Sequence, residues 1–253
     1  MDSVNRRYID DGDGTPESEW LDWLHHRGLP RISAADLVGP RQRAVVIAPH
    51  PDDEVLSVGG LMTQLGRLNR RLALVAVTDG EASHPGSPAW PKARLAQARV
   101  RETEAALATL EVDPLMMRLG LPDGGIAERQ RALTELLTTL LMPDDVVFTT
   151  WRFDGHPDHE ATALATRTAA ATVGATVFEV PVWGWHWARA GDARMPWSSA
   201  RLVTLGPDTV RRKGAAVEAF ATQTQPDPSA ALAPVLRAST VRRAQRPFEV
   251  LFA

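Results

Sequence analysis

Alternating apolar and polar blocks run along the chain from residue 43 onward. Short apolar runs, typical of strands buried on both faces, cover residues 44–49, 72–78, 113–121, 144–150 and 175–183. Between the runs lie segments with helical spacing of apolar residues, at 55–68, 94–110, 132–141 and 159–173. This alternation of strands and helices predicts an α/β fold, a Rossmann-like three-layer sandwich with a mostly parallel sheet.

The pattern before residue 43 is different. Residues 1–18 are polar and acidic, and they read as a flexible or surface-draped segment. Residues 19–26 have the spacing of a short amphipathic helix, with Trp20 and Trp23 on one face. We therefore expect residues 1–42 to form an N-terminal arm with a short helix, packed on the domain or flexible. Residues 43–253 are expected to form a single α/β domain.

Composition removes several classes of partner and site. The net charge of −3 provides no basic field for nucleic acid or an anionic membrane. The apolar runs are much shorter than the ~20 residues of a membrane span, and the N-terminus lacks the apolar core of a secretory signal. A cytoplasmic location is therefore expected. The chain has no cysteine, so any transition metal must be held by His, Asp or Glu.

Two motifs carry the candidate chemistry: HPDDE at residues 50–54 and HPDH at residues 156–159. Each follows a predicted buried strand, and the carboxyl ends of parallel strands share one edge of a sheet. His and Asp bind zinc and similar metals, and a catalytic zinc needs three protein ligands and an open position. One such motif alone could be a helix cap, but two in one chain favour a metal site.

The residues around these motifs resemble the LmbE-like or PIG-L family of deacetylases, which includes N-acetylglucosaminyl-phosphatidylinositol de-N-acetylases. The resemblance rests on APHPDDE (residues 48–54) followed by Gly-Gly, and on GHPDHEAT (residues 155–162). Weaker similarity is found at TDGE (78–81), along the helix at 99–112, and in the Lys-containing segment at 213–225. In the second of these, Glu111 stands where the family usually has glycine.

The resemblance implies a metal site with one zinc ion per chain. The matching ligands are His50, Asp53 and His159. Another divalent metal such as Fe2+ is an alternative, because two His and one Asp accept several metals. Glu54 either holds a ligand histidine from behind or simply begins the following helix.

The resemblance also implies a catalytic apparatus around the metal. Asp52 matches the general base, and His156 matches the histidine that stabilises the oxyanion or donates a proton. Asp158 matches the carboxylate that orients and tunes His156. In the mycothiol-pathway branch a tyrosine precedes the second motif, whereas this chain has WRFDG there and its single tyrosine is Tyr8.

Candidate substrate contacts are less sharply defined. They comprise a helix residue, a turn residue and part of a tryptophan-rich segment: Arg99, Asp123, Trp185, His186 and Trp187. Trp183, Trp185 and Trp187 alternate, so an extended segment would place all three on one face, with His186 on the other. That face would line the mouth of the cleft or be a covered edge strand.

These observations predict a zinc-dependent hydrolase that removes an acetyl or similar acyl group from an N-acylated amino sugar or glycoconjugate. The alternatives are an amidase for a larger amide conjugate, a metallophosphoesterase, or a non-catalytic Rossmann-like binding module. The sequence contains neither the G-x-G-x-x-G motif nor the P-loop that a Rossmann-like nucleotide-binding module usually has. The expected partner is a small N-acetylated sugar conjugate, with no nucleic acid and no membrane span. A homo-oligomer is compatible with the sequence.

Overall fold

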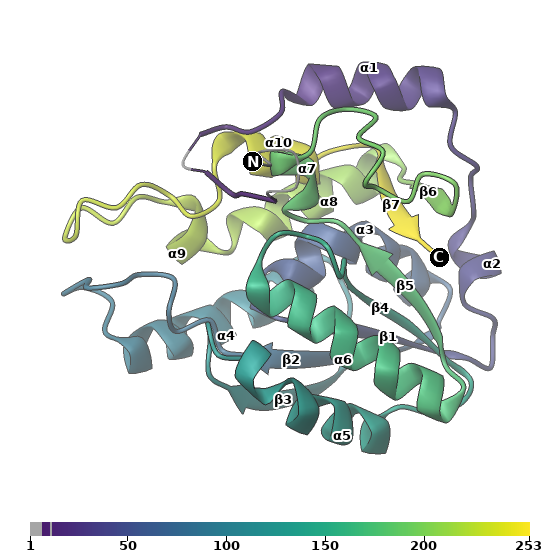
Figure 1. Ribbon diagram of the computed structural model, residues 1–253, viewed down its shortest axis with the longest axis horizontal. Coiled ribbons are helices and arrows are strands. Elements are labelled where there is room, and N and C mark those ends of the chain that lie inside the picture. Colours follow the sequence, from purple (N-terminus) through teal and green to yellow (C-terminus); the bar gives the residue numbers. More distant parts are fainter. Residues whose placement is uncertain (1–6, 11) are drawn as a thin grey trace, which may run out of the picture.

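A single seven-stranded sheet forms the centre of the protein (Figure 1). The computed structural model describes residues 7–10 and 12–253. The strands are β1 (Arg43–Ala48), β2 (Arg71–Thr78), β3 (Leu115–Leu121), β4 (Asp145–Thr150), β5 (Thr176–Val180), β6 (Ala200–Thr204) and β7 (Phe248–Phe252). Their order across the sheet is β3-β2-β1-β4-β5-β7-β6. Strands β1 to β5 pair in parallel, β7 pairs antiparallel with β5, and β6 pairs antiparallel with β7, so the predicted mostly parallel sheet is confirmed.

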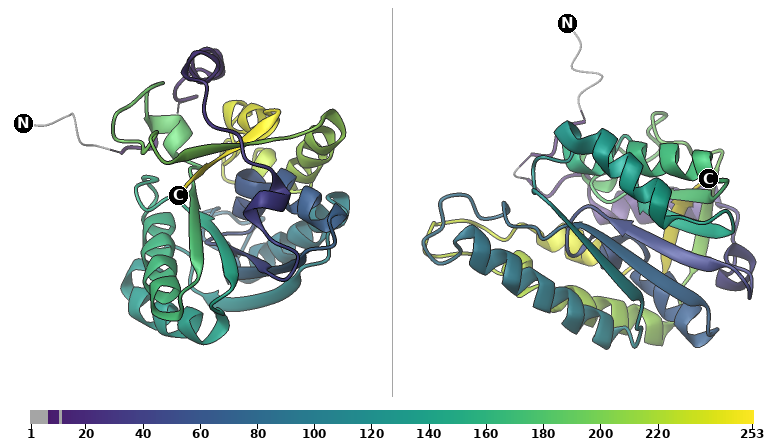
Figure 2. Two further views of the ribbon diagram at one scale, coloured as in Figure 1. Left: turned by 90° about the vertical axis from the view of Figure 1, so that its right-hand side faces the viewer. Right: turned by 90° about the horizontal axis from the view of Figure 1, so that it is seen from below.

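Helices cover both faces of the sheet. The right-hand view of Figure 2 shows α5 and α6 on one side and α4 and α8 on the other. The longer helices are α1 (Glu17–Arg27), α3 (Asp53–Arg67), α4 (Lys92–Thr109), α5 (Gln130–Leu140), α6 (Pro157–Val173), α8 (Pro207–Glu218) and α10 (Ala238–Ala244). Short helical turns are α2 (Ala34–Leu37), η2 (Ala127–Arg129), α7 (Gly184–Trp187) and α9 (Ala221–Thr224). The arrangement is the expected three-layer sandwich.

The residues of β1 explain why the central strands read as continuous apolar runs. Val45 and Ile47 belong to the core formed with α5 and α6. Val46 and Ala48 belong to the core on the opposite face, formed with α3, α4 and α8. Because successive side chains point to opposite faces and both faces are covered, every position favours an apolar residue.

The described part of the N-terminal arm packs against the sheet. Trp20 on α1 is fully buried, and its ring lies 4.8 Å from that of Trp185. Glu17 accepts two hydrogen bonds of 2.7 Å from Arg246, close to β7. These contacts place α1 over the antiparallel end of the sheet, where Figure 1 shows it. Residues 1–6 and 11, part of the segment expected to be draped or flexible, lie outside the described residues.

Most element boundaries lie within one or two residues of the sequence-based prediction, and two of the differences bear on the site. The predicted strand at residues 175–183 ends at Val180, and the chain turns into α7 instead of continuing. Helix α6 starts at Pro157, earlier than predicted, because His156 caps it and proline is well tolerated in the first turn. Among the residues that the structure describes, every helix is too short or too polar to cross a membrane.

Candidate metal centre and active site

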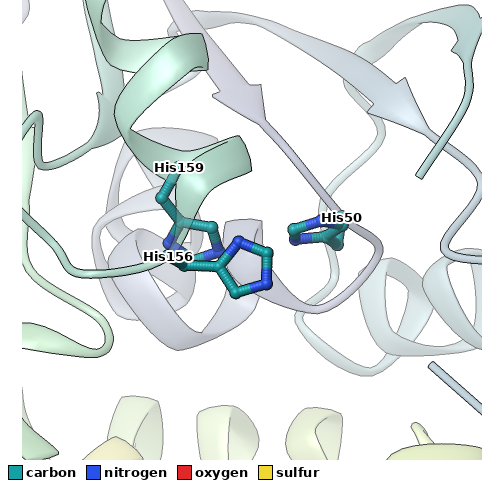
Figure 3. A group of neighbouring side chains, drawn as sticks. All are labelled: His50, His156 and His159. Carbon is teal, nitrogen blue, oxygen red and sulfur yellow. The ribbon is translucent and has the colours of Figure 1, made fainter. Parts of the chain in front are cut away.

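Two neighbouring parallel strands bring the two motifs together. Strands β1 and β4 pair from Arg43–Asp145 onward, so their carboxyl ends lie at the same edge of the sheet. His50 lies in the loop that follows β1, and His156 and His159 lie at the start of α6 after β4. Figure 3 shows the three imidazole rings facing one another across this edge. Ring nitrogens of all three lie within 4.8 Å of one another.

The three predicted ligand side chains also converge. Asp53 Oδ2 lies 3.2 Å from His50 Nδ1 and 3.2 Å from His159 Nε2. Around a tetrahedral zinc with bonds of about 2.0–2.1 Å, neighbouring ligand atoms are about 3.3 Å apart. All three residues are buried. Asp53 Oδ2 thus lies between the two rings, and the grouping of His50 and His159 with His156 within 4.8 Å supports a place for one divalent metal ion here.

A carboxylate stands behind each of these two histidines. His159 Nδ1 lies 2.8 Å from Asp154 Oδ2. His50 Nε2 lies 3.2 Å from Asp158 Oδ2 and 3.2 Å from Asp123 Oδ1. When either ring is neutral, the carboxylate behind it holds the ring N–H, so the other nitrogen, on the side of Asp53, is the one left to bind a metal. Paired carboxylate–histidine arrangements of this kind orient metal ligands in proteins.

The pKa values of these groups follow from burial and charge. Burial disfavours the charged form of His159, but the charges of Asp53 and Asp154 outweigh burial and raise its pKa to about 9. Burial likewise acts against protonated His50, yet contacts with Asp123, Asp158 and Asp53 raise its pKa well above 6.5. Without a metal, protons therefore balance the carboxylates, and a metal must compete with those protons.

Asp52 has the properties of a general base. Burial raises the pKa of its carboxyl to about 7, against the opposing effect of the positive charge of Arg99. Arg99 Nη2 donates a hydrogen bond of 3.1 Å to Asp52 Oδ2, and Arg99 also donates to the carbonyl oxygens of Pro51 and Gly80. The backbone of Asp52 has a φ of 117°, a strained value for a residue with a side chain. Arg99 thus lowers the pKa of the Asp52 carboxyl and also stabilises the backbone turn that carries it.

His156 is a neutral hydrogen-bond donor. Burial and the neighbouring charges of His159 and His50 lower its pKa to about 3. Its Nδ1 accepts a hydrogen bond of 3.3 Å from the backbone N–H of Asp158. The ring proton is therefore assigned to Nε2.

The prediction that Asp158 orients and tunes His156 is met only in its second part: the negative charge of Asp158 acts to raise the pKa of that ring, but its carboxylate is directed elsewhere. Asp158 Oδ2 contacts His50 and accepts a hydrogen bond of 2.7 Å from Gly124 N, while Oδ1 accepts one of 3.2 Å from Ile126 N. The loop after β3 thereby turns the carboxylate away from His156. Only the backbone of Asp158 contacts that ring.

Glu54 is placed at the start of a helix, one of the two options considered for it. It lies in the first turn of α3, where its Oε2 accepts a hydrogen bond of 3.0 Å from Asp52 N. The contacts described for this carboxyl include neither ligand histidine. Burial and the charge of Asp52 raise its pKa to about 8. Its contact with the backbone of the base supports the strained turn.

A cavity of about 270 Å³ opens beside these groups. It is lined by both motifs and by Arg99 and Asp123, as expected for two of the candidate substrate contacts. Leu56, Trp183 and Leu236 add an apolar wall. The loops at 80–91 and 225–237 form its rim and lie side by side at the left of Figure 1, with a contact of 3.2 Å between the hydroxyls of Ser87 and Ser229.

The expected role of Trp185, His186 and Trp187 in lining the cavity is wrong. Trp183 is the tryptophan of this segment in its lining. Trp185 packs on Trp20, Trp187 Nε1 donates to Asp154 O at 2.8 Å, and His186 Nε2 contacts Asp10 at 3.1 Å. The reason is α7: a helical turn rotates successive side chains by about 100°, so the alternation of an extended strand does not apply.

Sequence reasoning missed Asp154. It lies two residues before the second motif, in the WRFDG loop, whose lack of a tyrosine is its most evident feature in the sequence. An aspartate in a polar turn after a buried strand usually faces solvent, whereas the side chain of Asp154 is fully buried. Its proximity to the metal-ligand motif was the only available signal.

Comparisons with known proteins agree with this site. The family model for GlcNAc-PI de-N-acetylase (PIG-L) matches residues 45–170, which include both motifs. A 1D-myo-inositol 2-acetamido-2-deoxy-alpha-D-glucopyranoside deacetylase of Mycolicibacterium gilvum (strain PYR-GCK) is 26% identical over 191 residues. That alignment covers 66% of this chain and 65% of the relative, so the chain spans slightly less than two thirds of that protein.

Solved structures share the architecture. A conserved protein of Thermus thermophilus superposes with a TM-score of 0.54 at 26% identity, covering 72% of this chain and 80% of that one. The zinc-inhibited form of teicoplanin deacetylase Orf2 has a TM-score of 0.59 at 22% identity, with 72% and 85% covered, and it supports the fold alone. With both motifs inside the matched range and at one edge of the sheet, residues 45–170 form a domain of the PIG-L (LmbE-like) de-N-acetylase family.

Proposed function

We propose that this chain is a zinc-dependent hydrolase that removes an acetyl or similar acyl group from an N-acylated amino sugar or glycoconjugate. The observation that carries the proposal is the convergence of His50 and His159 on Asp53, beside the cavity that Asp52 and His156 line. A similar protein described as a deacetylase of an acetamido sugar supports the substrate class.

His50 Nδ1, Asp53 Oδ2 and His159 Nε2 would hold the metal. When bound, zinc would supply Lewis acidity to an amide carbonyl and lower the pKa of water to about 7. The same donors suit Fe2+, and our preference for zinc rests on the family resemblance. The carboxylates of Asp154 and Asp158 keep the ring protons on the far nitrogens of the two histidines.

Asp52 would accept the proton of the attacking water. Arg99 engages its Oδ2, which leaves Oδ1 for the proton. A base whose pKa is near 7 combines a useful deprotonated fraction with adequate basicity at neutral pH. The same carboxyl would then return the proton to the leaving nitrogen.

His156 would stabilise the developing oxyanion. Because its Nδ1 accepts from the backbone, its Nε2–H is the donor available to the cavity that the ring lines. A neutral donor already fixed in place costs no reorganisation during the reaction. This assignment also accounts for an oxyanion site without a tyrosine in the preceding loop.

The substrate would be positioned by the remaining cavity residues. Arg99 Nε is buried and has no hydrogen-bond partner among the described residues, so it is a candidate donor to substrate. Asp123 lines the same cavity, with its Oδ1 3.2 Å from His50 Nε2, and is a candidate acceptor for a sugar hydroxyl. Trp183 offers an indole for an apolar sugar face or an aglycone.

The test is acetate release from a panel of N-acetylated amino sugars and their conjugates. We expect the zinc-loaded protein to release acetate, and both the chelator-treated protein and Asp52→Ala to be inactive. The panel should include amides with longer acyl groups, because preference for these would favour the amidase alternative. A zinc-replete protein that hydrolyses no amide in the panel would contradict the proposal.

A further inference from the structure

Asp154 connects the metal centre to the wall of the cavity. Its carboxylate is fully buried and faces four N–H groups. Oδ1 accepts from Val182 N at 3.0 Å and Gly184 N at 2.8 Å. Oδ2 accepts from Trp183 N at 2.9 Å and lies 2.8 Å from His159 Nδ1.

We propose that Asp154 is a positioning residue whose single carboxylate fixes both the metal-binding nitrogen of His159 and the cavity wall at Trp183. This inference rests on the proposed function as far as the metal is concerned. It goes further by joining metal affinity and substrate binding through one side chain that does not line the cavity.

The first half of the proposal concerns the tautomer of His159. An acceptor at Nδ1 keeps the proton on that nitrogen, which leaves the lone pair of Nε2 directed towards Asp53 Oδ2, 3.2 Å away. Replacing the carboxylate by an amide can reverse this pairing, because an amide N–H would donate to Nδ1 and move the ring proton to Nε2. A histidine protonated on its ligand nitrogen cannot bind a metal.

The second half concerns the chain from Val182 to Gly184. Three consecutive backbone amides point at Asp154, so this turn is built around the carboxylate. The fit is close, since a Cβ at Gly184 would lie 3.3 Å from Asp154 Oδ1 and 3.2 Å from Pro181 Cβ. Trp187 Nε1 donates to the backbone carbonyl of Asp154 at 2.8 Å and closes the turn from the other side.

The three amides are expensive to leave unpaired. A buried polar group without its hydrogen bond is strongly destabilising, so loss of the carboxylate should rearrange the turn rather than leave it in place. Movement of the turn carries Trp183 with it, because the amide of Trp183 is one of the three. A single substitution should therefore alter both the ligand and the wall.

The experiment compares Asp154→Asn with a matched control, Asp145→Asn. Asp145 is a similarly buried aspartate at the opposite end of β4, where it pairs with Arg43 and accepts from Met142 N at 2.8 Å. Both variants remove one buried negative charge. We would measure the Tm of the metal-free proteins, the zinc Kd by competition with a chromophoric chelator, and the visible spectrum of the Co2+-loaded forms.

We expect both variants to lower the Tm of the metal-free protein. Only Asp154→Asn should weaken zinc binding, by about 10–100-fold, and change the Co2+ spectrum. If Asp154→Asn retains activity, its KM should also be higher than that of the wild type. A zinc Kd within about twofold of wild type, with an unchanged Co2+ spectrum, would overturn the proposal, since a loss of that ligand's orientation should exceed it.

If Asp154→Asn fails to fold, a milder variant tests the same effect on zinc affinity. Gly184→Ala retains the carboxylate but places a methyl group against it, so a several-fold weaker zinc affinity is expected. An unchanged affinity would again contradict the proposal. The zinc Kd and the Co2+ spectrum do not depend on turnover. A wild-type protein that binds zinc but hydrolyses no amide would therefore overturn the proposed function, while the effect of Asp154 on the metal site would still be tested.

Discussion

Arg99 and Asp52 form a buried ion pair that joins α4 to the loop after β1. Arg99 Nη2 donates to Asp52 Oδ2 at 3.1 Å, and the same guanidinium donates to two backbone carbonyls around the strained Asp52 turn. The positive charge opposes the effect of burial, which raises the pKa of this carboxyl to about 7. The pKa of the Asp52 carboxyl, and with it its strength as a base, therefore also depends on a residue of α4, outside both motifs.

Replacing Arg99 with methionine should shift the pH dependence of the reaction. Loss of the positive charge raises the pKa of Asp52, and the base must be deprotonated to act, so the acidic limb of the kcat/KM profile should move to higher pH. The control is Arg101→Met, because Arg101 lies exposed on the same helix. A profile for Arg99→Met that coincides with the control would contradict the role assigned to this pair.

Asp52→Ala should separate metal binding from catalysis. Asp52 contributes none of the three proposed ligand atoms, so we expect the variant to bind zinc with nearly the wild-type stoichiometry. Its kcat should fall by about 10²–10⁴-fold, the usual contribution of a general base. Measured zinc content and single-turnover rates check the two parts, and full activity in the metal-replete variant would assign the proton transfer to another group.

Zinc should reverse the pH dependence of stability at the metal centre. Without metal, the pKa of His159 is raised to about 9 against 6.5 for an ordinary histidine, so its contribution is complete below about 6.5 and is lost as pH rises towards 9. Zinc binds the deprotonated rings, so stabilisation by zinc should instead grow over the same range. Denaturant melts with zinc and with chelator at several pH values measure both trends.

A histidine substitution provides the control for that experiment. At a free zinc concentration of about 100 times Kd, the metal should add about 2.7 kcal/mol to the free energy of unfolding. His159→Ala should abolish this increment, whereas His25→Ala, at an exposed position on α1, should retain it. Equal stabilisation of both variants by zinc would place the metal away from His159.

Two tryptophans close in sequence should behave differently. Trp183 is half-buried and lines the cavity, so Trp183→Ala should raise KM with little change in Tm. Trp185 is buried against Trp20 and Trp197, so Trp185→Ala should cost about 3–5 kcal/mol of stability. The protein that remains folded should have normal kinetics. A KM effect confined to Trp185→Ala would contradict the placement of these side chains.

Local sequence patterns predicted the framework of the site. The apolar run at β1 is buried on both faces, and this burial alone makes the strand recognisable and fixes where it ends. The residues that follow such a strand must lie at the carboxyl edge, and this rule predicts that His50 and His159 lie close together. The likeness of both motifs to one family supplied the assignment of ligands and base.

The network behind the ligands could not be predicted in this way. Asp158 was expected to contact His156, its neighbour in the motif, but its side chain reaches His50 on another strand end. The choice depends on the loop after β3, whose amides at Gly124 and Ile126 hold the carboxylate. These hydrogen bonds join residues far apart in the chain, so they cannot be predicted from the local periodicity of the sequence.

Local patterns were sufficient to predict the layers, the parallel strands and the edge at which His50, Asp53 and His159 meet, because burial on both faces and strand-end placement are local rules. Two features depended on the assembled fold: which carboxylate orients which histidine, and that Trp183 rather than Trp185 faces the cavity. A short helical turn rotates that segment, and its amides are satisfied by Asp154 from a neighbouring strand end. Hydrogen-bond satisfaction of buried groups is a property of the assembled fold, so it becomes visible only when distant segments have been packed together.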